Sequence, residues 1–258
     1  MFNLIKITLI KFNLYNFIRH SSLYYLILKF KNPSYTESLN KDLLFFNKIL
    51  KKKNLIFDVG SNQGDKAFVF SKIGKKIILF EPDKICCDFL ENRFKNLENI
   101  LIEKIALTGR KGDKKLFITV ENNSSYNSLN LKRINFLKNN SKFLLKKIYI
   151  KTKSINFYIK KYGIPDFLKI DTEGSEYEII KSIKKEHKPL ISCICFEANL
   201  PSFFKETLMI ISLFPRSSFN LRIWNKYNFV YHKNVNAKDL KLYLRNKKLT
   251  YDIFIFNI

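Results

Sequence analysis

The sequence predicts an α/β fold, in which a seven-stranded, mostly parallel sheet carries helices on both faces and ends in a late antiparallel strand pair. Short apolar runs that end in an acid, at 54–58 and 76–81, alternate with segments of helical spacing. The connections between these segments are only a few residues long. This order of strands and helices is typical of a parallel sheet that is covered on both faces.

The elements are assigned from apolar periodicity, with strands as short apolar runs and helices as segments whose apolar residues recur every three or four positions. The expected strands are 54–58, 76–81, 99–107, 115–120, 148–153, 166–171 and 190–197, followed by 225–232 and 250–258 as the antiparallel pair. The expected helices are 65–73, stopping at Gly74, then 83–94 and 175–185. The segment 121–147 is rich in Asn and Ser and has no clean period. We place the domain at 51–258 and treat 1–50 as a basic and apolar helical arm.

The formal net charge is +25 over 258 residues, which is typical of proteins that bind nucleic acid or membranes. Only seven of the 47 basic residues are arginine, however. Surfaces that recognise phosphate and bases usually rely on arginine, because its planar guanidinium pairs with phosphate at two points. We therefore favour a compositional origin of the charge, since a chain rich in Lys, Ile, Asn and Phe is typical of an AT-rich genome.

The four cysteines stand as Cys86-Cys87 and Cys193-x-Cys195. Neither pair has the C-x-x-C spacing of a zinc ribbon or a redox motif. We expect buried free thiols in a reducing compartment, a cytoplasmic protein, and no bound metal.

Residues 1–31 mix apolar side chains with Lys6, Lys11, Arg19 and Lys29. No apolar run approaches the roughly 18 residues that span a bilayer. Two interpretations stay open: a basic amphipathic helix resting on the inner membrane face, or a helix packed against the domain or a partner.

A glycine-containing turn at 58–64, Asp-Val-Gly-Ser-Asn-Gln-Gly, lies between the first strand and helix. Glycines there would let a ligand approach the main chain at a helix N-terminus. Glu81 ends the next strand, 17 residues after Gly64, where a carboxylate can accept hydrogen bonds from both hydroxyls of an adenosine ribose. The turn lacks the G-x-G-x-x-G of dinucleotide binders, which favours S-adenosylmethionine as the cofactor.

Three strings together resemble the FkbM family of methyltransferases: Ile-Phe-Asp-Val-Gly-Ser-Asn-Gln-Gly at 56–64, Leu-Phe-Glu-Pro at 79–82, and Phe-Leu-Lys-Ile-Asp-Thr-Glu-Gly-Ser-Glu at 167–176. The resemblance extends over about 54–197. It implies a Rossmann-like class I methyltransferase, with many relatives acting on hydroxyls of sugars, polysaccharides or secondary metabolites. The residues that it implies for the cofactor site are Asp58, Gly60, Ser61, Asn62, Gly64, Glu81, Pro82 and Ala106. Lys104 stands near the position where many methyltransferases use an acid to read adenine, and it puts that contact in doubt.

Asp171 and Glu173 are the candidate catalytic residues. The strand before them should end at the same edge of the sheet as Asp58 and Glu81. Methyl transfer needs an acceptor oxygen that is held in line and relieved of its proton. Either carboxylate could take that proton, hold a hydroxyl, ligate a divalent metal, or merely anchor the loop. Glu197 is a weaker candidate, while Ser175 and Glu178 fit a helix capping box.

Two other functions remain as alternatives to a small-molecule or glycan O-methyltransferase. An RNA methyltransferase would account for the charge, although the chain has no Asn-Pro-Pro-Tyr-like motif. A non-catalytic Rossmann-like module could bind membrane or nucleic acid through its lysines. The intact turn at 60–64 together with Glu81 argues against such a module.

Overall fold

The computed structural model describes residues 33–50, 53–109, 112–119, 127–130, 132–135 and 145–257. Within these residues, seven strands form one sheet in the spatial order β3-β2-β1-β7-β8-β10-β9. Their bounds in that order are Ile100–Glu103, Lys76–Phe80, Leu55–Val59, Phe167–Ile170, Cys193–Asn199, Thr250–Phe256 and Ser218–Ile223. The pairs from β3 to β8 are parallel, and β10 pairs antiparallel with both β8 and β9. The predicted fold class is confirmed.

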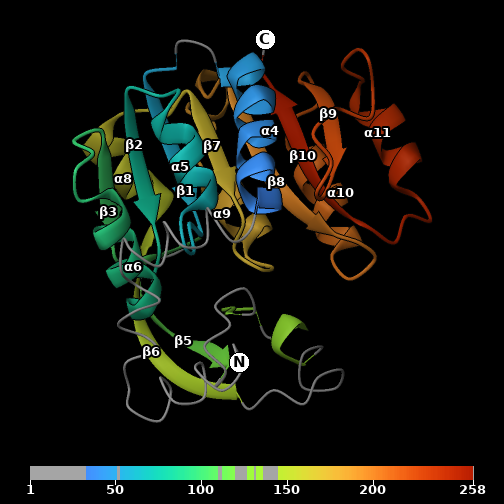
Figure 1. The fold of residues 1–258 in the computed structure, drawn as a ribbon. Helices are drawn as coiled ribbons and strands as arrows, with labels where there is room; N and C mark the ends of the chain where they lie inside the picture. Colours follow the sequence, from blue (N-terminus) through green and yellow to red (C-terminus); the bar gives the residue numbers. More distant parts are fainter. Residues whose placement is uncertain are drawn as a thin grey trace, which may run out of the picture.

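Helices cover both faces of this sheet (Figure 1). One face carries α4 (Pro33–Leu50), α5 (Asp65–Ser71) and α6 (Lys84–Phe94). The other face carries α8 (Ile155–Tyr162), α9 (Glu176–Ser182), α10 (Phe204–Ser212) and α11 (Ala237–Leu244). A short 3-10 helix, η2 (Lys188–Leu190), precedes β8.

The strands are apolar throughout because both of their faces are buried. In β1 all five residues are buried, and successive side chains alternate between the two cores. Ile56 packs with Phe70 and Phe167 on the α4 side, while Phe57 packs with Phe80 on the α8 side. The continuous apolar runs of the sequence are therefore buried parallel strands.

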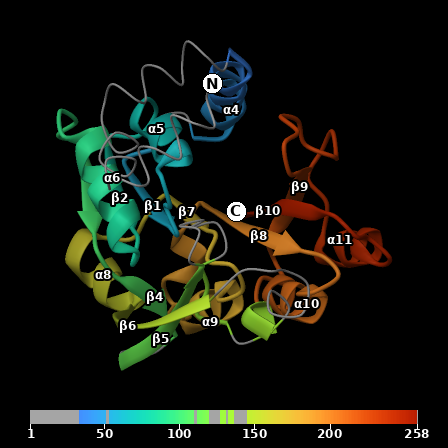
Figure 2. The same ribbon diagram turned by 60° about the horizontal axis from the view of Figure 1, so that its bottom comes forward.

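A second, three-stranded sheet lies at the carboxyl ends of the parallel strands (Figures 1 and 2). It has the order β4-β6-β5, with β4 at Ala106–Thr108, β6 at Leu145–Ser154 and β5 at Gly112–Thr119. The predicted single strand at 99–107 is wrong, because the chain turns at Lys104 and its two halves join different sheets. An apolar run that divides between two sheets has the same local pattern as one continuous strand.

The antiparallel partner of β10 is β9 at Ser218–Ile223, so the prediction of a strand at 225–232 is wrong. Asn220 and Arg222 interrupt the apolar pattern of β9, although both are buried. The charge of Arg222 is met by distant carboxylates, which its local sequence does not reveal. Asn225 instead starts a turn, with a φ of 61°.

Helix α4 shares a core with the strands, since Phe46 and Leu50 are fully buried. The division of the chain at residue 50 stays a prediction. Residues 1–31, for which we weighed a membrane-surface helix, lie outside the described residues. Among the residues that are described, no helix is both long and apolar enough to cross a membrane.

Candidate active site

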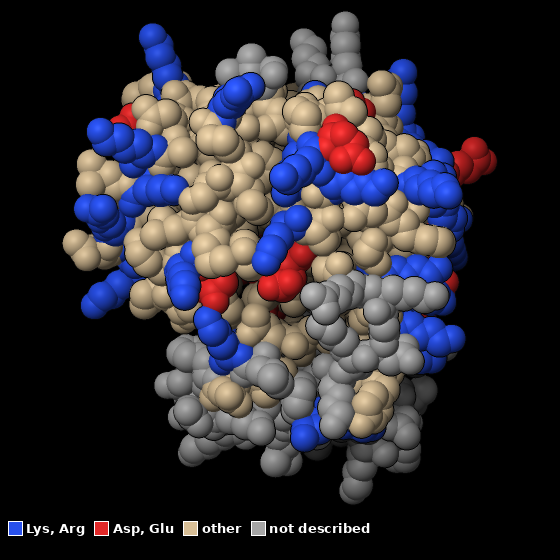
Figure 3. All heavy atoms as spheres, turned by 180° about the vertical axis from the view of Figure 1, so that it is seen from behind, with Lys and Arg blue, Asp and Glu red and all other residues tan. Residues whose placement is uncertain are grey.

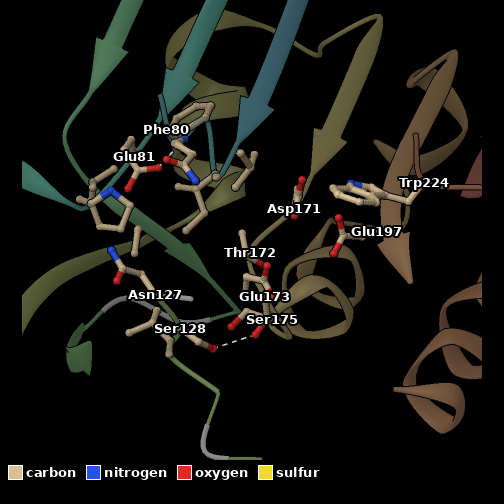
Figure 4. Close-up of a pocket in the computed structure, with 18 residues that line it drawn as sticks. Phe80, Glu81, Asn127, Ser128, Asp171, Thr172, Glu173, Ser175, Glu197 and Trp224 are labelled. Carbon is tan, nitrogen blue, oxygen red and sulfur yellow. Dashed lines mark hydrogen bonds between the residues drawn. The ribbon is translucent and has the colours of Figure 1, made fainter. Parts of the chain in front are cut away.

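A cavity of about 250 Å³ opens at the carboxyl edge of the main sheet (Figure 4). The loops after β1, β2, β7 and β8 contribute to its wall, together with Ile105–Leu107 and Asn127–Leu129. In Figure 4, Glu81 lies on one side of the cavity, Trp224 on the opposite side, and Asp171, Thr172 and Glu173 between them. The predicted cofactor end and the predicted catalytic acids thus face a single cavity.

The two glycines of the turn after β1 make room for other parts of the protein. Gly60 has a φ of 81°, and a Cβ atom there would lie 1.8 Å from the backbone oxygen of Asp171. Gly64 has a φ of 79°, and its Cβ would meet Leu90 and Phe94 on α6. Gly60 lines the cavity but Gly64 does not. These positions therefore need glycine because neighbouring backbone and side chains of the same domain pack closely against them. This reason stands beside the one predicted from the sequence, that glycine lets a ligand approach the main chain.

Glu81 is buried at the end of β2, and its carboxylate is held by two backbone amides. Asn62 N donates to one oxygen at 2.8 Å, and Asp83 N donates to the other at 2.9 Å. Burial raises the pKa of Glu81 to about 7, against the effect of these amides. Each carboxylate oxygen can accept a second hydrogen bond, and the residue lines the cavity. Glu81 is therefore preorganised to receive two further donors.

Asp58 is buried beneath the turn and does not line the cavity. Neither of its carboxylate oxygens accepts a hydrogen bond from the described residues, and the nearest cation is Lys169 Nζ at 4.0 Å. Burial raises the pKa of Asp58. The Ser61 hydroxyl donates to the backbone oxygen of Asp58 at 2.8 Å, so Ser61 stabilises the turn and also lies off the cavity.

The loop after β7 is anchored by Glu176. Its carboxylate accepts from Thr172 N at 2.7 Å, from Thr172 Oγ1 at 2.9 Å and from Gly174 N at 3.2 Å. Ser175 begins α9 without a side-chain capping bond, so the expected capping box is not formed. Since Glu176 satisfies the loop amides, Asp171 and Glu173 are left for other contacts.

Asp171 and Glu173 each lie beside a cation. Lys169 Nζ contacts Asp171 Oδ2 at 2.9 Å, and Arg133 contacts Glu173 Oε2 at 2.8 Å. Burial raises the pKa of Glu173 to about 8, and Arg133 opposes that shift. The Ser128 hydroxyl donates to the backbone oxygen of Glu173 at 2.7 Å and ties this loop to the segment 127–130.

Glu197 completes a group of three carboxylates with Asp171 and Glu173. One oxygen from each lies within 4.8 Å of the others, a spacing that could hold a divalent cation. Burial, with Asp171 and Glu173 nearby, raises the pKa of Glu197. Asn199 donates to Glu197 at 2.7 Å. The negative charge of three neighbouring carboxylates can be lowered by a bound metal ion or by a proton that the carboxylates share.

The comparison with family models identifies the protein. A model of the methyltransferase FkbM domain matches residues 58–231, which include the turn, Glu81 and all three carboxylates. The chain belongs to the FkbM methyltransferase family. The resemblance read from the three sequence strings is thus confirmed, and the fold is that of a class I, Rossmann-like methyltransferase.

No curated protein matches this FkbM-family chain. Among solved structures, an FkbM methyltransferase from Methylobacillus flagellatus KT is 17% identical, with a TM-score of 0.47 over 79% of this chain and 43% of that one. An S-adenosylmethionine-dependent O-methyltransferase from Thermotoga maritima is 10% identical, with a TM-score of 0.44 over 85% of this chain and 65% of that one. A methyltransferase-like protein from Streptococcus mutans, in complex with S-adenosylhomocysteine, is 10% identical, with a TM-score of 0.42 over 84% and 95%. Our chain thus spans less than half of the Methylobacillus protein. S-adenosylmethionine is the cofactor that the sequence of this FkbM domain predicts.

The residues of the FkbM domain fit this cofactor. Glu81 offers a buried carboxylate with free acceptor positions, which suits a ribose diol. Gly60, Asn62, Pro82 and Ala106 line the cavity as the sequence suggested, whereas Asp58, Ser61 and Gly64 support the wall from behind.

The acid at the end of β3, Glu103, does not line the cavity in this FkbM domain. Glu103 turns to α8, where Lys161 contacts it at 2.6 Å and Tyr158 at 3.2 Å. Lys104 pairs with Glu91 on α6 at 2.7 Å. Because Glu103 and Lys104 both pair with helices, neither side chain is placed to contact adenine, as Lys104 in the sequence led us to expect.

Several residues at the site were not singled out from the sequence, among them the polar or aromatic side chains of Asn127, Ser128, Arg133 and Trp224. The first three lie in the segment 121–147, where no apolar periodicity allows helices, strands or inward-facing residues to be predicted. Trp224 is the single tryptophan of the chain, and that rarity is the one signal that could have marked it.

Proposed function

We propose that this protein transfers a methyl group from S-adenosylmethionine to a hydroxyl oxygen of a sugar, polysaccharide or secondary metabolite. The observation that supports it best is the single cavity that joins Glu81 at one side to Asp171, Glu173 and Glu197 at the other. When bound, the cofactor supplies an electrophilic methyl group on a sulfonium. The protein then needs only to hold both partners in line and accept one proton.

We assign the cofactor to the side of Glu81. The carboxylate of Glu81 accepts hydrogen bonds from the ribose hydroxyls, while the backbone around Gly60 and Asn62 contacts the methionine part. Asn127 is a candidate for reading adenine, because its side-chain amide donates to Asp83 at 3.1 Å while its buried Oδ1 has no partner among the described residues. An unpartnered buried acceptor is costly and suits an exocyclic amine.

We assign the proton to Glu173. Asp171 contacts Lys169 Nζ at 2.9 Å, which fixes its carboxylate and suits it to orient the acceptor. Burial makes the carboxylate of Glu173 a stronger base than an exposed one, although Arg133 partly offsets this. The Glu173 carboxylate would take the hydroxyl proton of the acceptor, whose oxygen would receive the methyl group that the bound cofactor supplies.

The proposal is tested with full-length protein in two measurements. Calorimetry or thermal melting should show binding of S-adenosylhomocysteine, since a ligand of the folded state raises its melting temperature. Transfer of labelled methyl from S-adenosylmethionine to methyl glycosides should then give O-methyl products. A protein that binds neither form of the cofactor would be the non-catalytic module. Methylation of RNA in place of glycosides would establish the RNA enzyme.

A further inference from the structure

Trp224 occupies an unusual position beside the active-site carboxylates. It follows β9 directly, and its backbone N donates to Thr250 O at 3.0 Å, which fixes the main chain. The side chain is nevertheless 58% exposed. Figure 4 shows the indole beside Asp171 and Glu197, across the cavity from Glu81.

The same three residues also line a second, smaller cavity of about 60 Å³. Asp171, Glu197 and Trp224 belong to the walls of both cavities and stand between them. The other wall of the small cavity is strongly polar and includes Lys66, Arg222 and Asp252. A space of this size, lined by charges, suits hydroxyl groups or water rather than an apolar group.

An exposed indole next to carboxylates has a defined ligand chemistry. Its face is a large, rigid apolar surface, and it has few conformations to lose on binding. Within the described residues, its ring stacks on no other ring and its N–H has no partner, so both remain available. A flat-lying ring with C–H groups on its face and hydroxyls at its rim would satisfy the indole and the carboxylates together.

We propose that Trp224 is the platform on which the acceptor ring lies, and that this ring belongs to a carbohydrate. This rests on the proposed function, because it takes the methyl acceptor to enter from the side opposite Glu81. The target hydroxyl of the sugar ring then faces Glu173, and neighbouring hydroxyls contact Asp171 and Glu197. The far edge of the sugar ring reaches the small polar cavity. A nucleotide fits less well, since its phosphate would have to lie beside the carboxyl groups of Asp171 and Glu197 next to the indole.

Because Trp224 is the single tryptophan, the tryptophan emission of the full-length protein, excited at the red edge to avoid its 13 tyrosines, reports on this position alone. The experiment titrates protein saturated with S-adenosylhomocysteine with methyl glycosides of mannose, glucose, galactose and rhamnose, and separately with nucleoside monophosphates. We expect a saturable change in tryptophan emission with at least one glycoside.

Substitution separates a platform from a structural side chain. In methyl-transfer assays with that glycoside, Trp224→Ala should raise KM by about tenfold and leave S-adenosylhomocysteine affinity unchanged. Trp224→Phe should restore most of the loss, because it returns an aromatic face. Leu242→Ala is the matched control, since Leu242 is 62% exposed and lines neither cavity.

Three results would overturn the platform. They are a protein that binds S-adenosylhomocysteine but shows no saturable emission change with any glycoside, saturation by nucleotides alone, or an unchanged KM in Trp224→Ala. Failure to bind S-adenosylhomocysteine at all would instead refute the proposed function.

Discussion

Glu81 shows how a single buried side chain can be made ready for a ligand. Two backbone amides fix its carboxylate, yet burial keeps its pKa near 7, so that further donors are needed to stabilise the charged form fully. Ribose hydroxyls would supply these donors. The same carboxylate also fixes the turn after β1 through Asn62.

We expect Glu81→Ala to weaken S-adenosylhomocysteine binding by roughly 1–3 kcal/mol, through loss of charge-assisted hydrogen bonds to the ribose. Calorimetry on the folded variant measures this directly. Glu91→Ala provides the control, because Glu91 makes only an exposed pair with Lys104. Equal affinities for Glu81→Ala and the wild type would remove Glu81 from the cofactor site.

Glu173→Gln should lower turnover by about 10²–10⁴-fold while cofactor affinity is kept, since the change removes a base and preserves shape. A base must be deprotonated to act, so wild-type turnover should rise with pH through about 8, the pKa of Glu173. The variant should lose that rise. Asp171→Asn should lower turnover without removing the rise, because Asp171 orients the acceptor.

A metal at the three carboxylates would give a different pattern. Wild-type activity would then be lost to a chelator and restored by Mg²⁺ or Mn²⁺. If Glu173→Gln and Asp171→Asn both leave turnover intact and only lower the melting temperature, Asp171 and Glu173 serve to stabilise the loop after β7.

At the scale of elements, a buried ionic cluster joins α4 to the far end of the sheet. Arg222 on β9 contacts Asp42 of α4 at 2.7 Å and Asp252 of β10 at 2.6 Å. Lys66 at the start of α5 also contacts Asp42. The guanidinium of Arg222 lies over the rings of Phe45 and Phe46. The cluster thus links four elements, three of them (α4, β9 and β10) through Arg222 itself.

Arg222→Ala should lower the free energy of unfolding by about 3–5 kcal/mol, because it leaves the buried Asp252 without its ion-pair partner and Asp42 with Lys66 alone. Urea denaturation measures the change. Lys41→Ala removes an exposed pair with Glu37 on the same helix and should have a much smaller effect, because solvent screens that pair. A loss as small as that of Lys41→Ala would show that the cluster contributes little to docking α4.

The elements that the sequence predicted well are those whose environment is uniform along the strand. β1, β2 and β7 are buried on both faces, so an apolar run ending in an acid identified them and placed Asp171 and Glu81 at one edge. β9 was missed because the partners of Arg222 lie 30 and 180 residues away. The role of Glu176 as the anchor of the loop after β7 was not predicted either, because its hydrogen bonds to Thr172 and Gly174 depend on how the loop folds, whereas Ser175 and Glu178 match a capping box in sequence.

At the scale of the whole molecule, the face drawn in Figure 3 carries no single basic patch among its described residues. Figure 3 shows basic side chains spread widely over one face and separated in many places by uncharged surface. This distribution is the one expected if the lysine content reflects composition. The site itself is acidic, with three carboxylates around the acceptor side.

The N-terminal arm gives a prediction at this scale. If residues 1–31 form a membrane-surface helix, their deletion should release the protein from anionic vesicles without changing its affinity for S-adenosylhomocysteine. Vesicle sedimentation at about 50 and 200 mM salt compares the two proteins, because screening weakens the lysine contribution. Equal vesicle binding by the shortened protein would show that the remaining lysines, and not the arm, hold it there.

The contact between Gly60 and the backbone oxygen of Asp171 has a consequence for engineering. The loop that we assign to the methyl donor and the loop that we assign to the acceptor touch main chain to main chain at Gly60 and Asp171, with no adjustable side chain between them. A substitution that adds bulk at residue 60 must therefore displace both loops, and a remodelled 171–174 loop would disturb donor affinity as well as acceptor choice. Variants selected for a new acceptor would be expected to change outside this junction, at positions such as Trp224, where specificity can vary while the donor loop stays in place.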